Sequence, residues 1–134
     1  SADSLFALLE ERLCQMVQES RLQREEESRK PIRAAKQYIM NHYVEPITLE
    51  LVAEKVGFSS SYFSSLFKKE LHISFVDYIT ESRVKKAKDL LLETDLKTHE
   101  VAEITGFADD SYFSKTFKKI TGKLPSSFRK RTKL

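Results

Sequence analysis

A repeated stretch constrains this chain more than any other feature. Residues 52–69 read VAEKVGFSSSYFSSLFKK, and residues 101–119 read VAEITGFADDSYFSKTFKK. With one extra residue allowed in the second copy, before Ser111, twelve of the eighteen aligned positions are identical. Agreement of this extent within one chain indicates an internal duplication. Because each copy is short, helical in composition and ends in two lysines, we expect two related helical units.

The composition favours a chain made mainly of α-helices. Hydrophobic residues make up 40% of the 134 residues and charged residues 32%, a balance typical of globular proteins with amphipathic helices. The chain has only three glycines and three prolines, so long loops and many-stranded sheets are not expected. Cys14 is the only cysteine, which excludes a disulfide framework and a cysteine-rich zinc site. No apolar run approaches the roughly 20 residues that span a bilayer and no signal peptide is visible, so we expect a cytoplasmic location without a membrane partner.

Charge is distributed unevenly along the chain. The formal net charge is +3, and residues 1–30 carry five basic and seven acidic groups. From Ser111 to the end there are eight basic residues and no acidic one. A basic end on a near-neutral body is expected of a protein that binds a polyanion. The alternative is a basic tail that is merely solvated.

The N-terminal segment has the spacing of an amphipathic helix. Apolar residues recur at intervals of three and four over residues 3–30, namely Leu5, Leu9, Leu13, Met16 and Val17. The apolar stripe is too short for a long coiled coil, which needs three or four heptads. Two interpretations stay open: a helix that forms a homodimer or docks on another domain, and a linker helix with frayed ends.

Pro31 is placed to begin a new helix, since proline suits the first helical turn. This helix should end before Pro46, because the residue before a proline avoids helical geometry. Its buried face is expected to consist of Ile32, Ala35, Ile39 and Tyr43. We therefore place a domain boundary near residue 30, between a linker over residues 1–30 and a folded domain over residues 31–134.

The first copy of the repeat predicts a helix-turn-helix unit over about residues 48–70. Thr48 can cap its first helix, Gly57 can take the left-handed turn, and Ser59, Ser60 or Ser61 can cap its second helix. Two helices joined by a short glycine turn form this motif. The expected buried residues are Leu49, Val52, Ala53, Val56, Tyr62, Phe63, Leu66 and Phe67.

A long helix over about residues 74–93 is predicted to connect the two copies, with Ser74 as its cap. Roughly 20 residues at about 1.5 Å each span about 30 Å, close to the roughly 34 Å between successive major-groove faces of B-DNA. The helix therefore suits a spacer between two DNA-reading units. Its inner side is expected to hold Phe75, Ile79, Ala87, Leu90 and Leu91.

The second helix-turn-helix unit is predicted over about residues 98–120. Thr98 is its expected first cap, Gly106 its turn residue, and Asp109 or Asp110 the cap of its second helix. Pro125 should open a last short helix around Phe128. The expected buried residues are Val101, Ala102, Ile104, Tyr112, Phe113 and Phe117.

These motifs together resemble the AraC family of bacterial transcription regulators. The stretch GFADDSYFSKTFKKITGKLPSSFR is very similar to the C-terminal signature of that family, and the first copy, the connector YITESRVKKAKDLLL and the spacing between copies also match. The resemblance covers residues 31–134. The segment IRAAKQYIMNHY is most similar to AraC-type output domains of two-component response regulators.

The resemblance implies a transcription regulator that binds double-stranded DNA and RNA polymerase, uses no cofactor, and activates more often than it represses. One residue departs from the family pattern. His72 stands where the first copy usually has glycine. We therefore expect the turn after the first recognition helix to differ.

Base contacts are expected from the outward faces of the second helix of each unit. By the resemblance, Ser61, Ser64 and Ser65 match base-contacting positions of the family. A serine hydroxyl donates and accepts hydrogen bonds, so it distinguishes bases weakly, whereas Lys115 can reach O6 and N7 of guanine. The alternative for the serines is helix solubility with a cap at Ser59 or Ser60. The predicted base-contacting set is Ser60, Ser61, Ser64, Ser65, Ser111, Ser114 and Lys115.

Phosphate contacts are expected from cations at the ends of the recognition helices. For Arg129, disorder of the tail is the alternative, and Arg83 in the connector is expected to form a structural ion pair. The predicted phosphate-contacting set is Lys68, Lys69, Lys118, Lys119 and Arg129.

The sequence offers no constellation for catalysis. The three histidines are scattered without an HxxxH pair, and no GxSxG elbow occurs. Two other classes of function compete with DNA binding: a protein-interaction module with a basic solubilising tail, and a membrane-surface binder. The first leaves the duplication unexplained, and the second lacks an extensive apolar stripe after residue 120.

Overall fold

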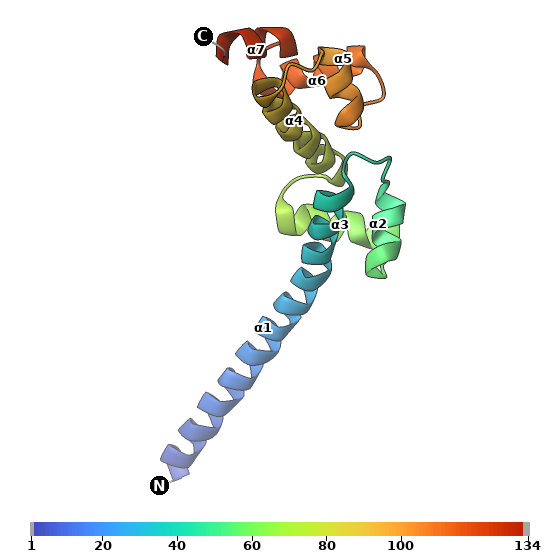
Figure 1. Ribbon diagram of the computed structural model, residues 1–134. Helices are drawn as coiled ribbons and strands as arrows, with labels where there is room; N and C mark the ends of the chain where they lie inside the picture. Colours follow the sequence, from blue (N-terminus) through green and yellow to red (C-terminus); the bar gives the residue numbers. More distant parts are fainter. Residues whose placement is uncertain (1, 133–134) are drawn as a thin grey trace.

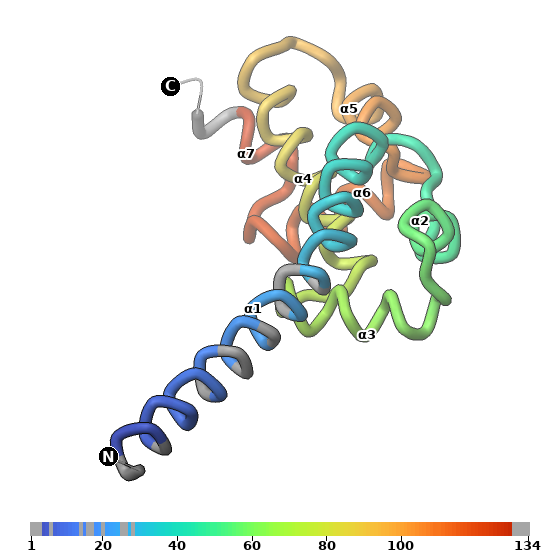
Figure 2. The backbone as a smooth tube through the Cα atoms, turned by 90° about the horizontal axis from the view of Figure 1, so that it is seen from below, coloured from blue at the N-terminus to red at the C-terminus, as the bar shows by residue number. Residues whose placement is uncertain are grey.

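The computed structural model describes residues 2–132, and over this range the chain forms seven α-helices and no β-strand (Figure 1). The all-α prediction is confirmed. Figures 1 and 2 show the N-terminal part of α1 extending away from the body that the other helices form. The helices are α1 (Ala2–His42), α2 (Leu49–Val56), α3 (Ser60–Leu71), α4 (Phe75–Glu93), α5 (Thr98–Ile104), α6 (Asp110–Thr121) and α7 (Pro125–Thr132).

Helix α1 is continuous over 41 residues and contains Pro31 in its interior. The prediction that a separate helix begins at Pro31 is therefore wrong. An interior proline removes one backbone hydrogen bond and costs roughly 3 kcal/mol. The residues on both sides are strong helix formers, mainly Gln, Arg, Glu, Lys and Ala, and they continue the helix across the proline.

The buried side chains form two separate cores, which define two lobes. The first lobe contains the end of α1 from residue 32, α2, α3 and the start of α4, around Ile32, Ala35, Ile39, Val52, Ala53, Phe63, Leu66, Phe67, Phe75 and Ile79. The second lobe contains the rest of α4 with α5, α6 and α7, around Val84, Ala87, Leu91, Val101, Ala102, Phe107, Phe113 and Phe117. Figure 1 shows α4 running from one lobe into the other.

Helix α4 is the predicted connector, and its side chains belong to both cores. Phe75 and Ile79 lie in the first core, and Val84, Ala87 and Leu91 lie in the second. The helix has 19 residues without glycine or proline. Each lobe therefore packs against a different part of one uninterrupted helix.

The duplication extends well beyond the two similar stretches of sequence. The buried residues of α1 and those of α4 in the second core have the same spacing of three and then four residues (Ile32, Ala35 and Ile39; Val84, Ala87 and Leu91). The Tyr78 ring meets the Phe67 ring edge-on at 5.5 Å, and the Phe128 ring meets the Phe117 ring in the same way at 5.4 Å. The repeated unit is thus a set of four helices.

Side-chain caps begin four of the helices at predicted residues. In each case the capping oxygen accepts from the backbone N–H of the residue three positions later in the chain. The capping atoms and distances are Thr48 Oγ1 (3.1 Å), Ser59 Oγ (3.3 Å), Ser74 Oγ (3.1 Å) and Asp109 Oδ1 (2.6 Å). The predicted cap at Thr98 is wrong, because that residue is the first of α5 and Lys97 before it makes no side-chain cap. Helix α5 consequently begins without the stabilisation that a capping oxygen supplies.

His72 ends α3 in a left-handed conformation, with φ 59° and ψ 23°. Its N–H donates to the Lys68 carbonyl at 2.8 Å, as the N–H of Gly122 donates to the Lys118 carbonyl after α6. The expected difference at this turn is therefore absent, and α3 and α6 end alike. The histidine adopts a conformation in which its Cβ is crowded by the following carbonyl.

Replacing His72 with glycine is expected to raise the free energy of unfolding by about 0.5–1 kcal/mol. Relief of the left-handed strain, about 1–2 kcal/mol, exceeds the extra chain entropy of glycine in the unfolded state, about 0.4–1 kcal/mol. Urea unfolding followed by circular dichroism measures the change. The reverse substitution, Gly122→His, should destabilise by a similar amount. A loss of stability in His72→Gly would show that the imidazole makes a stabilising contact.

Candidate nucleic-acid interface

The two helix-turn-helix units have the same turn geometry. Gly57 follows α2 with φ 82°, and Gly106 follows α5 with φ 92°. The N–H of Phe58 donates to the Ala53 carbonyl at 2.9 Å, and the N–H of Phe107 donates to the Ala102 carbonyl at 3.0 Å. These bonds satisfy carbonyls at the helix ends and turn the chain toward α3 and α6.

Helices α3 and α6 each bury one face and present the opposite face outward. In α3, Phe63, Leu66 and Phe67 are buried, and in α6, Phe113 and Phe117 are buried. Residues three and four apart share one face of a helix. The predicted base-contacting residues lie at this spacing away from the core, with Ser61, Ser64, Ser65, Ser111 and Lys115 exposed and Ser60 and Ser114 half-buried.

Lysines lie at the C-terminal end of both outward faces. Lys68 and Lys69 are in the last turn of α3, Lys118 and Lys119 are in the last turn of α6, and all four side chains are exposed. Lys115 adds a fifth exposed cation one turn earlier on α6. The face of α6 therefore carries a positive charge in the middle where the face of α3 carries hydroxyls.

Three residues predicted to be buried are exposed instead. Ile104 is 47% exposed, Tyr62 53% and Tyr112 51%. Both tyrosines stand beside a buried phenylalanine in sequence, so they lie at the border of the apolar stripe, and their rings lean on Phe58 (5.0 Å) and Phe107 (6.0 Å). Because tyrosine hydroxyls also bind phosphate, Tyr62 and Tyr112 are candidate interface residues that the repeat alone had assigned to the scaffold.

Arg129 holds the end of α4 within the second lobe. Its Nε donates to the Leu91 carbonyl at 3.0 Å and its Nη2 to the Thr94 carbonyl at 3.3 Å. Carbonyls at a helix C-terminus lack partners within the helix and attract cations. Through these two bonds Arg129 supports the fold of the second lobe, and its contact with phosphate stays a prediction.

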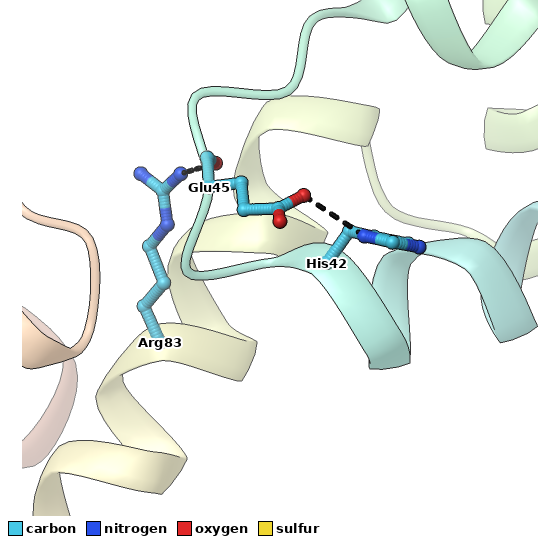
Figure 3. A network of polar contacts seen from close by, with 3 residues as sticks. All are labelled: His42, Glu45 and Arg83. Carbon is cyan, nitrogen blue, oxygen red and sulfur yellow. Dashed lines mark hydrogen bonds and ion pairs between the residues drawn. The ribbon is translucent and has the colours of Figure 1, made fainter.

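Arg83 makes the corresponding contacts after α1. Its Nε donates to the Tyr43 carbonyl at 2.7 Å and its Nη2 to the Glu45 carbonyl at 3.0 Å, so the predicted ion pair is wrong and the partners are backbone oxygens. The Glu45 carboxylate in turn contacts His42 Nδ1 at 2.8 Å (Figure 3). Burial lowers the pKa of the Arg83 guanidinium.

Neither a metal-binding cluster nor a membrane-spanning helix occurs among the described residues, which lie within residues 2–132. Among the side chains that the structure describes, no group of three or more His, Cys, Asp or Glu is arranged to hold a metal ion. Within the same range, no helix has the length and apolar character needed to cross a membrane.

Comparison with known proteins identifies the same domain. The helix-turn-helix domain family matches residues 52–131. The HTH-type transcriptional regulator YijO of Escherichia coli strain K12 is 37% identical over 117 residues, which are 87% of this chain and 41% of YijO. The chain thus spans less than half the length of this curated relative.

Solved structures share the arrangement of two lobes. The C-terminal domain of AraT, a response regulator from Geobacillus stearothermophilus, is similar with a TM-score of 0.73 and 43% identity over 75% of this chain and 84% of that chain. An AraC-type DNA-binding regulator from Chromobacterium violaceum is similar with a TM-score of 0.73 and 25% identity over 78% of this chain and 94% of that one. The family match includes both α3 and α6, and the chain covers most of the AraT domain. The chain therefore belongs to the AraC family of helix-turn-helix transcription regulators and comprises its DNA-binding domain.

Proposed function

We propose that the domain binds promoter DNA sequence-specifically, with α3 and α6 in successive major grooves on one face of the duplex. The observation that supports this most is the pair of outward polar faces on two recognition helices that one uninterrupted helix connects. At about 1.5 Å per residue, the 19 residues of α4 span about 29 Å. This length approaches one turn of B-DNA, about 34 Å.

The two lobes are proposed to differ in how strongly they discriminate bases. The first lobe offers hydroxyls, namely Ser60, Ser61, Ser64 and Ser65, which accept and donate to several base edges. The second lobe offers Lys115 with Ser111 and Ser114, and a lysine prefers the paired acceptors of guanine. Phosphate contacts come from Lys68, Lys69, Lys118 and Lys119 in both lobes, so docking is shared and discrimination is greater in the second.

Selection of bound sequences from random DNA tests this proposal. Two short boxes about one helical turn apart are expected, with stronger base preference in the box under α6. The affinity should also fall steeply with salt, because each neutralised phosphate releases counterions. Failure to enrich any sequence would refute the proposal and favour a protein-interaction module.

Replacing Lys115 with alanine is expected to relax base preference at one position and to weaken binding of the best site by about 5- to 100-fold. This range lies within the about 1–3 kcal/mol by which one specific base contact discriminates. Lys118→Ala is the matched control on the same helix: it should weaken all sequences about equally and reduce the salt slope by about 1. Electrophoretic mobility shifts with matched and mismatched duplexes measure both. Uniform weakening by both variants would contradict the assignment of Lys115 to a base.

We infer that the protein activates transcription through contact with RNA polymerase, as is most common in the AraC family. The similarity to the AraT domain supports a role as the output domain of a two-component response regulator. Transcription in vitro from a promoter that carries the selected site should increase when the protein is added. A decrease would indicate repression.

We infer that residues 1–30 form a homodimer in front of the DNA-binding domain, residues 31–134. The observation that favours this is a set of exposed leucines on the free part of α1: Leu5, Leu8, Leu9 and Leu13. Pairing with a second copy would remove these side chains from water. A concentration series in sedimentation equilibrium should show a dimer that the double substitution Leu9→Glu with Leu13→Glu abolishes. A monomer at all concentrations would leave these residues as a linker.

A further inference from the structure

The lobes touch each other at a point away from α4. The loop between α1 and α2 belongs to the first lobe, and the backbone of Val44 in that loop lies against Gly106 of the second. A Cβ placed on Gly106 would lie 2.6 Å from the Val44 carbonyl oxygen, closer than real Cβ atoms approach, whereas one on Gly57 or Gly122 would meet nothing within 4 Å. Glycine is required at this position for two reasons: a Cβ would collide with the Val44 carbonyl, and the backbone has a positive φ that other residues rarely adopt.

Arg83 holds that loop in place from the middle of α4. Its two hydrogen bonds go to the carbonyls of Tyr43 and Glu45, the residues on either side of Val44. Figure 3 shows the guanidinium reaching from α4 to the loop, while His42 contacts the Glu45 carboxylate from the other side. The loop is therefore fixed on both sides of the residue that meets Gly106.

The position of Arg83 along α4 makes it suited to connect the lobes. It lies between Ile79, the last α4 residue of the first core, and Val84, the first α4 residue of the second. Helix α4 is one attachment between the lobes, and the contact of the loop with Gly106 is a second attachment to the side of that helix.

We propose that Arg83, by holding residues 43–45 against Gly106, sets the angle between the lobes and thereby the spacing of the two DNA boxes that the domain accepts. This inference rests on the proposed binding of both recognition helices to DNA. Arg83 is a positioning residue in this proposal and touches no base. Moving one box by one base pair shifts it by about 3.4 Å and rotates it by about 35°, since a turn contains about 10–10.5 base pairs. A fixed angle between lobes tolerates neither change.

A purely structural role for Arg83 would affect stability but not the preference for spacing. Arg129 provides the matched control, because it makes the same kind of contact to the Leu91 and Thr94 carbonyls wholly within the second lobe. Arg83→Met and Arg129→Met each remove a guanidinium from two carbonyls and keep a long apolar side chain. Only the first of these substitutions releases the loop between the lobes.

The experiment compares the 134-residue protein with these variants on three duplexes: the selected site and two derivatives with one base pair inserted or deleted between the boxes. The wild type and Arg129→Met are expected to bind the derivatives at least tenfold more weakly than the selected site. We call the ratio of the dissociation constant for a derivative to that for the selected site the spacing ratio. In Arg83→Met the spacing ratio should fall to about threefold or less. An unchanged ratio in Arg83→Met would overturn the proposal.

A second pair of variants approaches the contact from the other lobe, which keeps the proposal testable if Arg83→Met does not fold. Gly106→Ala should alter the spacing ratio by threefold or more, and Gly57→Ala, which has the same backbone strain without the contact, should keep it. Equal ratios in the two would contradict the proposal. If the wild type bound no sequence selectively, the proposed function would fail instead, and that result is distinct from a selective wild type whose ratio Arg83→Met leaves unchanged.

Discussion

Replacing Phe117 with alanine is expected to lower the free energy of unfolding of the second lobe by about 3–5 kcal/mol, the range for removing a fully buried aromatic ring. Phe117 is fully buried, and its ring contacts those of Phe113 at 5.7 Å and Phe128 at 5.4 Å. The total free energy of unfolding of a domain is only about 5–15 kcal/mol. The loss should therefore unfold much of the second lobe at moderate urea concentrations.

The two separate cores make this effect local. Phe67 occupies the equivalent position in the first lobe and is also fully buried, so Phe67→Ala should destabilise that lobe by a similar amount. Hydrogen exchange followed residue by residue should show lost protection in α5, α6 and α7 for Phe117→Ala, and in α2 and α3 for Phe67→Ala. The exposed Ile120 on the same helix as Phe117 is the control, and Ile120→Ala should cost less than about 1 kcal/mol. Equal loss of protection in both lobes would show that α4 couples them into one cooperative unit.

Replacing Gly106 with alanine is expected to cost about 2–4 kcal/mol, well above the cost at its counterpart Gly57. Both residues have left-handed backbones, with φ 92° and φ 82°, and a Cβ in this conformation costs about 1–2 kcal/mol. Only at Gly106 does the new Cβ also press against the Val44 carbonyl, and such overpacking adds about 1–3 kcal/mol. For Gly57→Ala we expect a loss of about 1 kcal/mol.

Urea unfolding of the two variants under identical conditions measures this difference. Because the conformation and the substituted atom are the same at both positions, subtraction isolates the contact between the lobes. Losses that agree within error would mean that the turn before α6 does not pack on residue 44 in solution. A larger loss at Gly57 would also contradict the contact.

Local features were predictable because their causes lie within a few residues. The caps at Thr48, Ser59, Ser74 and Asp109 depend on an oxygen three residues before a free N–H. Apolar periodicity likewise gave most of the buried positions. Three of the errors lie where two local tendencies compete: at Tyr62 and Tyr112 on the border of an apolar stripe, and at Pro31, where strong helix formers on both sides continue α1.

The candidate interface was predictable in part. Outward polar residues on α3 and α6 follow from the same periodicity that places their phenylalanines inside. Their contacts with bases and phosphates remain predictions. Tyr62 and Tyr112 are added as candidates only because the structure leaves about half of each side chain exposed, with the rings against Phe58 and Phe107. Periodicity predicts which face of a helix a residue lies on. For a residue at the edge of the apolar face, the side chains packed around it in the tertiary structure decide whether it is buried or exposed.

Composition, the duplicated stretch and the connector between its copies were sufficient to predict an all-α chain with two helix-turn-helix units on one long helix, because hydrophobic spacing, caps and turn glycines act within a single helical turn. The relation between the two units required the tertiary structure. Arg83 and Arg129 find carbonyls 35 to 40 residues away in the chain, and Gly106 meets Val44 across the lobes. Contacts of this kind depend on how the helices pack and leave no periodic signal in the sequence.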